Sequence, residues 1–244
     1  MSVISDGTIG DQALEDLWDR PLALDLFAGA GGACRGLQTY GHHGLGWEVI
    51  GIDADQRKAR YYPGVFVKHD LTEGLPEVVD DYADQIEVVW ASAPCRFATD
   101  LQFARSGENL IPLARDLCQE IDPPVWILEN VPGARDHLEN PVQFCGSAFG
   151  LGVRKHRLFE TSFFAHGTPC SHPEKFDYAI GDREAPVTGY RQVHGLSPHA
   201  PLTAKALREV IPPAYIHELL DQYIHYAPHT HETAHSADHT PKCQ

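Results

Sequence analysis

The 244-residue sequence lacks several features that would place it in a membrane or secreted class. No apolar run approaches the roughly 20 residues that a bilayer-spanning helix needs. The first ten residues are polar and acidic, without the basic flank and hydrophobic core of a secretory signal. The six cysteines form no close Cys-x-x-Cys pair, which favours reduced thiols over a disulfide framework. We therefore expect a soluble protein of the cytoplasm with no membrane partner.

Positive charge is also scarce. The chain has 19 lysines and arginines against 34 acidic residues, and its formal net charge is −15. Nonspecific affinity for duplex nucleic acid comes largely from Lys and Arg side chains that displace counterions. A nucleic-acid substrate therefore requires a local basic cleft; otherwise the substrate is small. An acidic face exposed to solvent, away from any site, is the plainer explanation of the charge.

What the sequence does contain is a repeated alternation of short apolar runs and amphipathic segments in its first half. This pattern is typical of a doubly wound α/β sheet, and the length suits one main domain with a small appendage. In an open parallel sheet, ligands bind outside the carboxyl ends of the strands. We predict strands at Leu22–Leu26, Glu48–Ile52, Val65–Lys68, Ile86–Ala91 and Val125–Glu129, and helices at Ala33–Tyr40, Asp55–Tyr62, Glu77–Tyr82 and Leu110–Glu120.

The pattern changes after Pro132. Residues 143–164 predict short antiparallel edge strands punctuated by glycine, and residues 166–200, rich in Pro, Gly and His, predict an irregular insertion. An amphipathic helix should begin at Pro212-Pro213, since proline is tolerated in a first turn. The predicted division is an N-terminal extension (1–20), a catalytic and cofactor-binding core (21–164), a recognition insertion (165–202), a helix returning to the core (203–226) and a disordered tail (227–244).

The run Asp25-Leu-Phe-Ala-Gly-Ala-Gly-Gly32 predicts a cofactor loop. Its small residues permit a tight turn from a buried strand into a helix, where backbone amides can closely approach a ligand. Cys34 stands where the dinucleotide pattern requires its third glycine, which disfavours NAD. Asp53 ends the second strand, where a carboxylate can accept from ribose hydroxyls, and Asp70 follows the third, where it could meet an adenine. Helix N-capping is the alternative for both aspartates.

Cys95 is the candidate nucleophile. It follows Pro94 in a loop just past a very apolar strand, and a polar run comes after it. A thiolate is a strong nucleophile, and a neighbouring cation such as Arg96, or one of Arg154, Lys155 and Arg157 across the cleft, would favour the ionised form. The alternative is a buried structural cysteine.

Glu129 is the candidate acid. It ends the apolar strand that starts at Val125, so partial burial should raise the pKa of its carboxyl and keep it protonated near neutral pH. Such a group can hold a proton at a heterocycle nitrogen. The alternative is that Glu129 only caps the following turn.

Two histidine-containing segments raise the question of a metal. Cys170-Ser-His172, with His166 nearby, could begin a zinc site, but no second ligand pair follows at finger spacing. His231, His235 and His239 recur every four residues, yet the composition of the tail favours a flexible end. We therefore predict no metal.

The order of the motifs is similar to that of the cytosine-5 DNA methyltransferases. The series comprises the glycine loop, Pro94-Cys95, Glu129-Asn-Val131 and Arg154-Lys-His-Arg-Leu-Phe159. It resembles in particular the short members encoded by phages and prophages. The likeness covers about residues 22–164, with a weaker echo at Ile211-Pro-Pro-Ala-Tyr215. The glycine loop alone is weakly specific, whereas four motifs in the correct order are strongly so.

The resemblance implies a Rossmann-like class I methyltransferase fold, a mostly parallel sheet with an antiparallel edge, and transfer of a methyl group from S-adenosylmethionine to C5 of cytosine in DNA. Cys95 would add to C6 while Glu129 stabilises the proton at N3, and Arg157 and Lys155 would help to hold the base and its phosphate. A cytosine in a duplex must be rotated out of the stack. The implied cofactor contacts are Asp25, Phe27, Ala28, Gly29, Gly31, Gly32, Asp53, Ala54, Asp70, Leu71 and Pro94.

The sequence also departs from the family pattern. Ala93 and Arg96 stand in place of the usual proline and glutamine around the cysteine, and Val153 and Lys155 replace a glutamine and an arginine. Between Ser162 and Ala200 there are three basic residues against four acidic ones. Such a short insertion could read only a short DNA site or close over a free cytosine nucleotide. A catalytically weak binding protein with the cofactor fold is a further alternative. We expect a monomer or a weak dimer.

Overall fold

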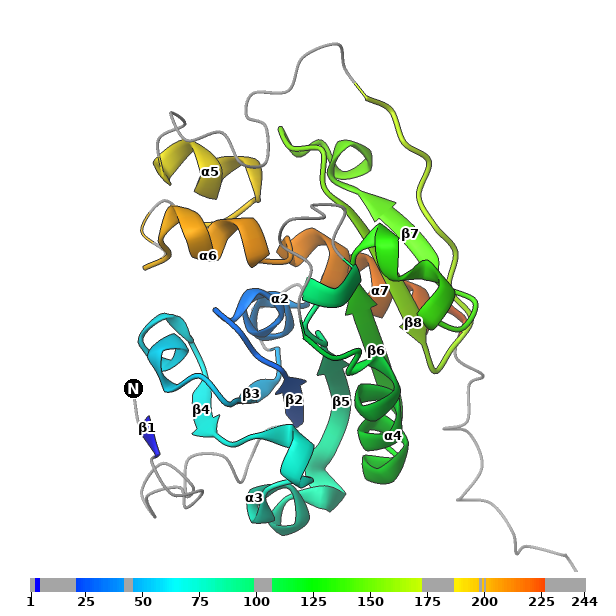
Figure 1. The fold of residues 1–244 in the computed structure, drawn as a ribbon. Helices are drawn as coiled ribbons and strands as arrows, with labels where there is room; N and C mark the ends of the chain where they lie inside the picture. The colour runs from blue at the N-terminus through cyan, green and yellow to red at the C-terminus, as the bar shows by residue number, and fades with distance from the viewer. Residues whose placement is uncertain are drawn as a thin grey trace, which may run out of the picture.

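The computed structural model describes residues 3–4, 21–41, 46–98, 107–172, 187–197, 199 and 201–226. Within these residues one eight-stranded sheet organises the protein (Figure 1). Its six strands from β1 to β6 pair in parallel, while β8 pairs antiparallel with both β6 and β7. The predicted fold class, a mostly parallel sheet with an antiparallel edge, is confirmed. In spatial order the strands are β1 (Val3–Ile4), β4 (Val65–Lys68), β3 (Glu48–Asp53), β2 (Leu22–Leu26), β5 (Ile86–Ala91), β6 (Val125–Asn130), β8 (His156–Thr161) and β7 (Val142–Cys145).

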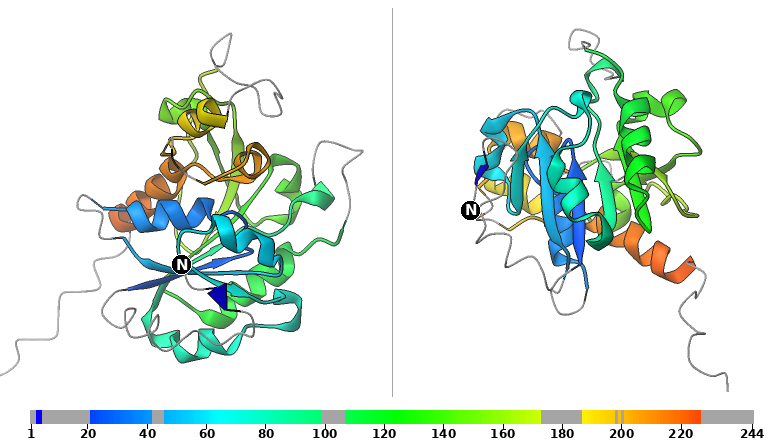
Figure 2. Two further views of the ribbon diagram at one scale, coloured as in Figure 1. Left: turned by 90° about the vertical axis from the view of Figure 1, so that its left-hand side faces the viewer. Right: turned by 90° about the horizontal axis from the view of Figure 1, so that it is seen from below.

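Helices cover both faces of this sheet (Figures 1 and 2). The apolar residues of β2 alternate between the faces: Leu22, Leu24 and Leu26 pack with α3 and α4, whereas Ala23 packs with α2 and α7. Because both faces are covered, all five residues of β2 are buried. The helices are α2 (Gly32–Thr39), α3 (Glu77–Asp81), α4 (Ile111–Ile121), α5 (Val187–Val193), α6 (Ala204–Glu209) and α7 (Pro213–Tyr226). None of the described helices is long and apolar enough to cross a bilayer.

Short 3₁₀ turns fill many of the connections. They are η1 (Gln56–Tyr61), η2 (Leu71–Glu73), η3 (Ala83–Gln85), η4 (Arg96–Ala98), η6 (Pro132–His137) and η7 (Gly146–Phe149). The first of them occupies the segment where the sequence predicted an α-helix. It follows the Asp55 cap and ends before Pro63, and the residue before a proline is disfavoured in helical conformation. The tighter 3₁₀ form closes this short connection.

Besides the two cores on the faces of the sheet, a third, smaller core lies beyond the carboxyl edge of the sheet. It contains Tyr190 of α5, Leu207 of α6 and Ala30 of the glycine loop, so the insertion packs directly onto that loop (Figure 1). The prediction of an irregular insertion is wrong for residues 187–193, which form α5. Residues 173–186, the predicted tail from 227, and most of the predicted extension (1–20) lie outside the described residues. The extension nevertheless contributes β1, a two-residue strand too short for its pattern to be recognised.

Candidate active site

The loop after β2 makes the turn that its small residues predicted. Gly29 and Gly31 have φ angles of 56° and 74°, in the left-handed region that favours glycine, and Gly31 caps α2. A Cβ at Gly32 would lie 2.6 Å from the backbone nitrogen of Ile211. Gly32 therefore lets the segment before α7 lie against the loop. The first and last motifs of the sequence meet at this point.

Asp53 ties the glycine loop to the end of β3. Its carboxylate accepts hydrogen bonds from the amides of Gly29 (2.9 Å) and Asp55 (2.8 Å), and the Lys58 ammonium lies 3.5 Å from Oδ2. Asp70 caps η2 by accepting from the amide and hydroxyl of Thr72, and these bonds lower the pKa of its exposed carboxyl. The capping alternative is thus realised at Asp70. Each carboxylate oxygen has two lone pairs, so these local bonds leave capacity for a ligand hydroxyl.

The other residues of the predicted cofactor set fall into two groups. Asp25 is buried and accepts a hydrogen bond from the Tyr62 hydroxyl (3.0 Å), and burial raises the pKa of its carboxyl well above the ordinary value. Asp25 therefore supports the glycine loop from the buried side. Gly31 and Gly32 are buried with it, as are Ala28 and Leu71, whereas Phe27, Gly29 and Asp53 are half-buried and Ala54, Asp70 and Pro94 are exposed.

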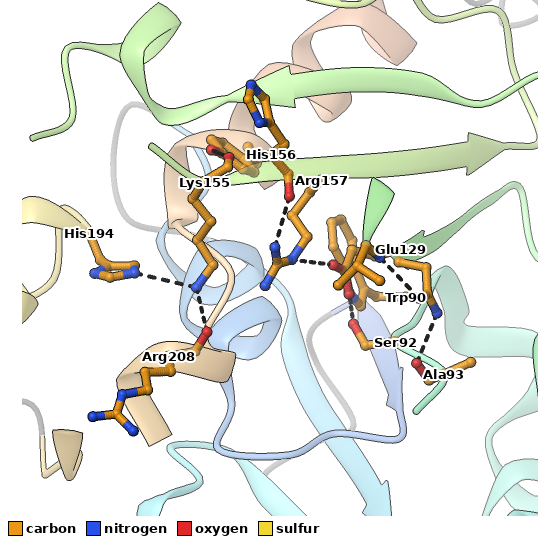
Figure 3. Close-up of polar contacts among 12 residues, drawn as sticks. Trp90, Ser92, Ala93, Glu129, Lys155, His156, Arg157, His194 and Arg208 are labelled. Atoms are coloured by element: carbon orange, nitrogen blue, oxygen red, sulfur yellow. Dashed lines mark hydrogen bonds and ion pairs between the residues drawn. The ribbon is translucent and has the colours of Figure 1, made fainter. Parts of the chain in front are cut away.

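Glu129 lies near the end of β6 and is 5% exposed. Its Oε1 is 2.8 Å from Nε of Arg157 on β8 (Figure 3). The Ser92 hydroxyl also donates to this carboxylate, and Nε1 of Trp90 in turn donates to Ser92 Oγ at 2.9 Å. Burial raises the pKa of Glu129, while Arg157 opposes that shift. The pKa of Glu129 is therefore raised, as the sequence predicted. Ser92 was not predicted, because a lone serine carries no distinguishing pattern.

Cys95 follows β5 in a loop where it is half-buried. Burial raises the pKa of its thiol most, and the nearby Glu129 carboxyl raises it further, while Arg157 acts in the opposite direction. Arg157 therefore lowers the pKa of Cys95, as predicted, but its effect is smaller than that of burial. The thiol thus keeps its proton more firmly than an exposed cysteine. The side chain of Arg96, another of the predicted cations, lies outside the described residues.

Asn130 holds the Cys95 loop in place. Its buried side chain donates to the carbonyl of Ala93 at 3.0 Å and accepts from the amide of Val131 at 3.0 Å. The end of β6 is thereby joined to the residue two positions before Cys95. The sequence alone assigns Asn130 no role, because only the folded structure places Ala93 beside it.

Lys155 interacts electrostatically with Glu129 and Cys95, as predicted, but its hydrogen bonds run to other residues. It is fully buried, and its Nζ lies 3.3 Å from His194 Nε2 and 3.0 Å from the Arg208 carbonyl (Figure 3). His194 Nδ1 lies 2.7 Å from the carbonyl of Tyr190, so we assign the ring proton to Nδ1 and the acceptor role to Nε2. Burial and Lys155 lower the pKa of His194 to about 3, and burial lowers that of Lys155 well below its ordinary value. Lys155 thus joins the start of β8 to α5 and the last turn of α6.

The family comparison agrees with this arrangement. The profile described as C-5 cytosine-specific DNA methylase matches residues 23–144. The chain belongs to this family. The matched range includes the glycine loop, Cys95 and Glu129, whereas Lys155 and Arg157 lie beyond it. A comparison with curated protein sequences gives no match.

Solved structures place this family member among methyltransferase folds. An Entamoeba histolytica methyltransferase is 11% identical with a TM-score of 0.56, covering 83% of this chain and 97% of its own. A DNA modification methyltransferase encoded within an E. coli prophage is 20% identical with a TM-score of 0.45, covering 58% of this chain. This chain spans 46% of the length of the prophage protein.

Proposed function

We propose that this family member is a DNA (cytosine-5-)-methyltransferase that uses S-adenosylmethionine and a covalent bond between Cys95 and C6 of the target base. One observation carries the proposal. The Cys95 thiol, the buried Glu129 carboxyl and the Arg157 guanidinium influence one another's charge, at the same sheet edge as the glycine loop. These are the nucleophile, acid and cation that the chemistry requires.

The glycine loop fits the cofactor. At Gly29 an added Cβ would meet no atom closer than 3.8 Å, so the loop is open there, while Asp53 and Asp70 supply carboxylates that suit ribose hydroxyls and an adenine edge. Gly29, Asp53 and Asp70 would therefore hold S-adenosylmethionine, and Gly31, Gly32 and the other predicted contacts would shape or support the pocket. When bound, the cofactor supplies an electrophilic methyl group on sulfur.

The residues then divide the chemistry between them. C5 of cytosine is a poor nucleophile, so the Cys95 thiol loses its proton to solvent and its sulfur forms a bond to C6. Glu129, whose raised pKa favours the protonated form, donates to N3 as negative charge develops on the ring. C5 would then carry the electron pair that takes up the methyl group, and the bound cofactor would leave as the neutral thioether. Loss of the C5 proton to solvent, expulsion of Cys95 as thiolate and return of the N3 proton to the Glu129 carboxylate restore the neutral aromatic ring, and Cys95 regains its proton from solvent.

Arg157 and the residues around it position this machinery. Its guanidinium holds Glu129 and favours the Cys95 thiolate, while the Trp90–Ser92 pair fixes the other side of the carboxylate. For Lys155 we propose a positioning role, since its buried ammonium contacts the insertion. We infer that it sets how α5 and α6 lie over the glycine loop.

Transfer of tritiated methyl groups from S-adenosylmethionine tests the function. We expect incorporation into duplex DNA by the unmodified protein, none by Cys95→Ser, and normal incorporation by Cys118→Ala, a buried cysteine of α4. A duplex containing 5-fluorocytosine should form a denaturant-stable adduct with the unmodified protein but not with Cys95→Ser. Full activity of Cys95→Ser would refute the covalent mechanism.

The same assay separates the remaining alternatives. Incorporation into dCMP but not into DNA would overturn the proposed substrate and support the free-nucleotide alternative. Transfer to no substrate, together with calorimetric binding of S-adenosylmethionine, would support a binding protein instead. Cys95→Ser should bind the cofactor as the unmodified protein does, since Cys95 acts on the base and not on the sulfonium.

A further inference from the structure

Four metal-ligating side chains converge at the antiparallel edge of the sheet. They are Cys145, His156, Cys170 and His172, and one ligand atom from each lies within 4.8 Å of every other. Cys145 ends β7 and His156 begins β8, and the strand register pairs these two residues directly. Cys170 and His172 come from the segment that follows β8. The second ligand pair that the sequence lacked at finger spacing is therefore supplied by the pairing of two strands.

Two of the ligand-to-ligand distances match those around one tetrahedral ion. Sγ of Cys145 lies 3.3 Å from Nε2 of His172, and Nε2 of His156 lies 3.3 Å from Sγ of Cys170. A zinc ion bonded at about 2.3 Å to sulfur and about 2.0–2.1 Å to nitrogen sets its ligand atoms roughly 3.3–3.8 Å apart. Two thiolates and two imidazoles in this arrangement are typical of zinc and poorly suited to magnesium or calcium.

The surrounding structure holds the ligands before any ion binds. The amide of Thr168 donates to the carbonyl of Gln143 at 3.1 Å, which lays the segment after β8 alongside β7. The Ser147 hydroxyl donates to Sγ of Cys145 and also accepts from the amide of Ser171, both at 3.3 Å. Ser147 therefore links both halves of the cluster and supports a thiolate, as outer-shell donors do in metal sites.

We propose that Cys145, His156, Cys170 and His172 bind one structural zinc ion. Four protein ligands close the coordination sphere, so the ion serves the fold and takes no part in the reaction. It fixes the start of β8 at His156, one residue before Arg157 (Figure 3). Through Cys170 and His172 it also anchors the chain within the insertion. The proposal does not depend on the methyl-transfer function.

Metal analysis of the full chain tests this directly. Protein purified without chelators should contain one zinc ion per chain by plasma mass spectrometry. Cys170→Ser is the informative variant, because Cys170 is exposed and its loss leaves the packed core intact. Its zinc affinity should fall by more than about 100-fold, since even outer-shell changes cost about 10–100-fold. His166→Gln, which changes an exposed neighbouring histidine outside the cluster, should keep the zinc.

Cobalt supplies a readout independent of stability. Co²⁺ added to the chelator-treated protein should give the visible bands of a tetrahedral site with a thiolate charge-transfer band, and zinc should abolish them. Zinc content in Cys170→Ser equal to that of the unmodified protein would overturn the proposal. A protein that contains no bound metal or gives no tetrahedral cobalt bands would also overturn it. A Cys145–Cys170 disulfide, found by mass spectrometry in protein prepared with zinc present, would do the same.

Discussion

Replacing Arg157 with methionine should destabilise the protein by an amount that grows as pH rises. The Glu129 carboxyl has a pKa above its ordinary value of 4.5 because it is buried. The folded state therefore binds a proton that the unfolded state releases, and stability falls as pH rises from the ordinary pKa through the raised one. Arg157 limits that loss by stabilising the carboxylate. Without it the pKa rises further, so the window of declining stability extends to higher pH.

The magnitude follows from the geometry. The guanidinium Nε and the carboxylate oxygen are 2.8 Å apart, and the two side chains are 14% and 7% exposed. Unit charges about 4 Å apart attract each other by about 4 kcal/mol at an effective dielectric constant near 20. Breaking a buried pair costs about 3–5 kcal/mol. We expect a loss of this order for Arg157→Met at pH 8, and a smaller loss at pH 5.5, where protonation of Glu129 removes the unpaired charge.

Urea unfolding at both pH values, followed by circular dichroism, measures these losses. The matched cycle consists of the unmodified protein, Arg157→Met, Glu129→Gln and the double variant. In the Glu129→Gln background the cost of Arg157→Met should be smaller and nearly independent of pH. An equal, pH-independent cost in both backgrounds would refute the electrostatic account and leave only a packing role for Arg157.

Three further predictions concern Glu129, Gly32 and Asn130 of the candidate site. Glu129→Gln should lower the pKa of the Cys95 thiol, since the carboxylate raises it, so iodoacetamide should alkylate Cys95 faster at pH 7; an unchanged or slower rate would contradict the coupling. Gly32→Ala places a methyl group 2.6 Å from the backbone nitrogen of Ile211, before α7. It should cost about 1–3 kcal/mol of stability, measured by thermal unfolding, and weaken cofactor binding, measured by calorimetry. Asn130→Ala leaves a buried carbonyl unpaired and should cost about 1–3 kcal/mol, with faster alkylation of Cys95 as its loop loosens; a variant of unchanged stability would show that the loop is held by other contacts.

The sheet was largely predictable because buried parallel strands are continuous apolar runs. The structure confirms the five predicted strands to within one residue at each end, from Leu22–Leu26 to the strand beginning at Val125. Local signals also located α4 and the antiparallel edge. For residues 56–61, which form a 3₁₀ turn, Pro63 is a local signal against the predicted α-helix. Local signals did not indicate that residues 187–193 form a helix, because tertiary packing decided that segment.

The sequence by itself determined which chemistry the protein can carry, since the order of the glycine loop, Cys95 and Glu129 depends on residue type and spacing alone. Only the tertiary structure decided where each basic or ligating side chain near β8 points. Alternation along the strand directs Arg157 to Glu129 and His156 away from it (Figure 3). The strand register pairs His156 with Cys145. Lys155, on the same side as Arg157, is instead covered by the insertion that contributes His194. Such contacts join residues far apart in the chain, and spacing along a sequence does not encode distance across a fold.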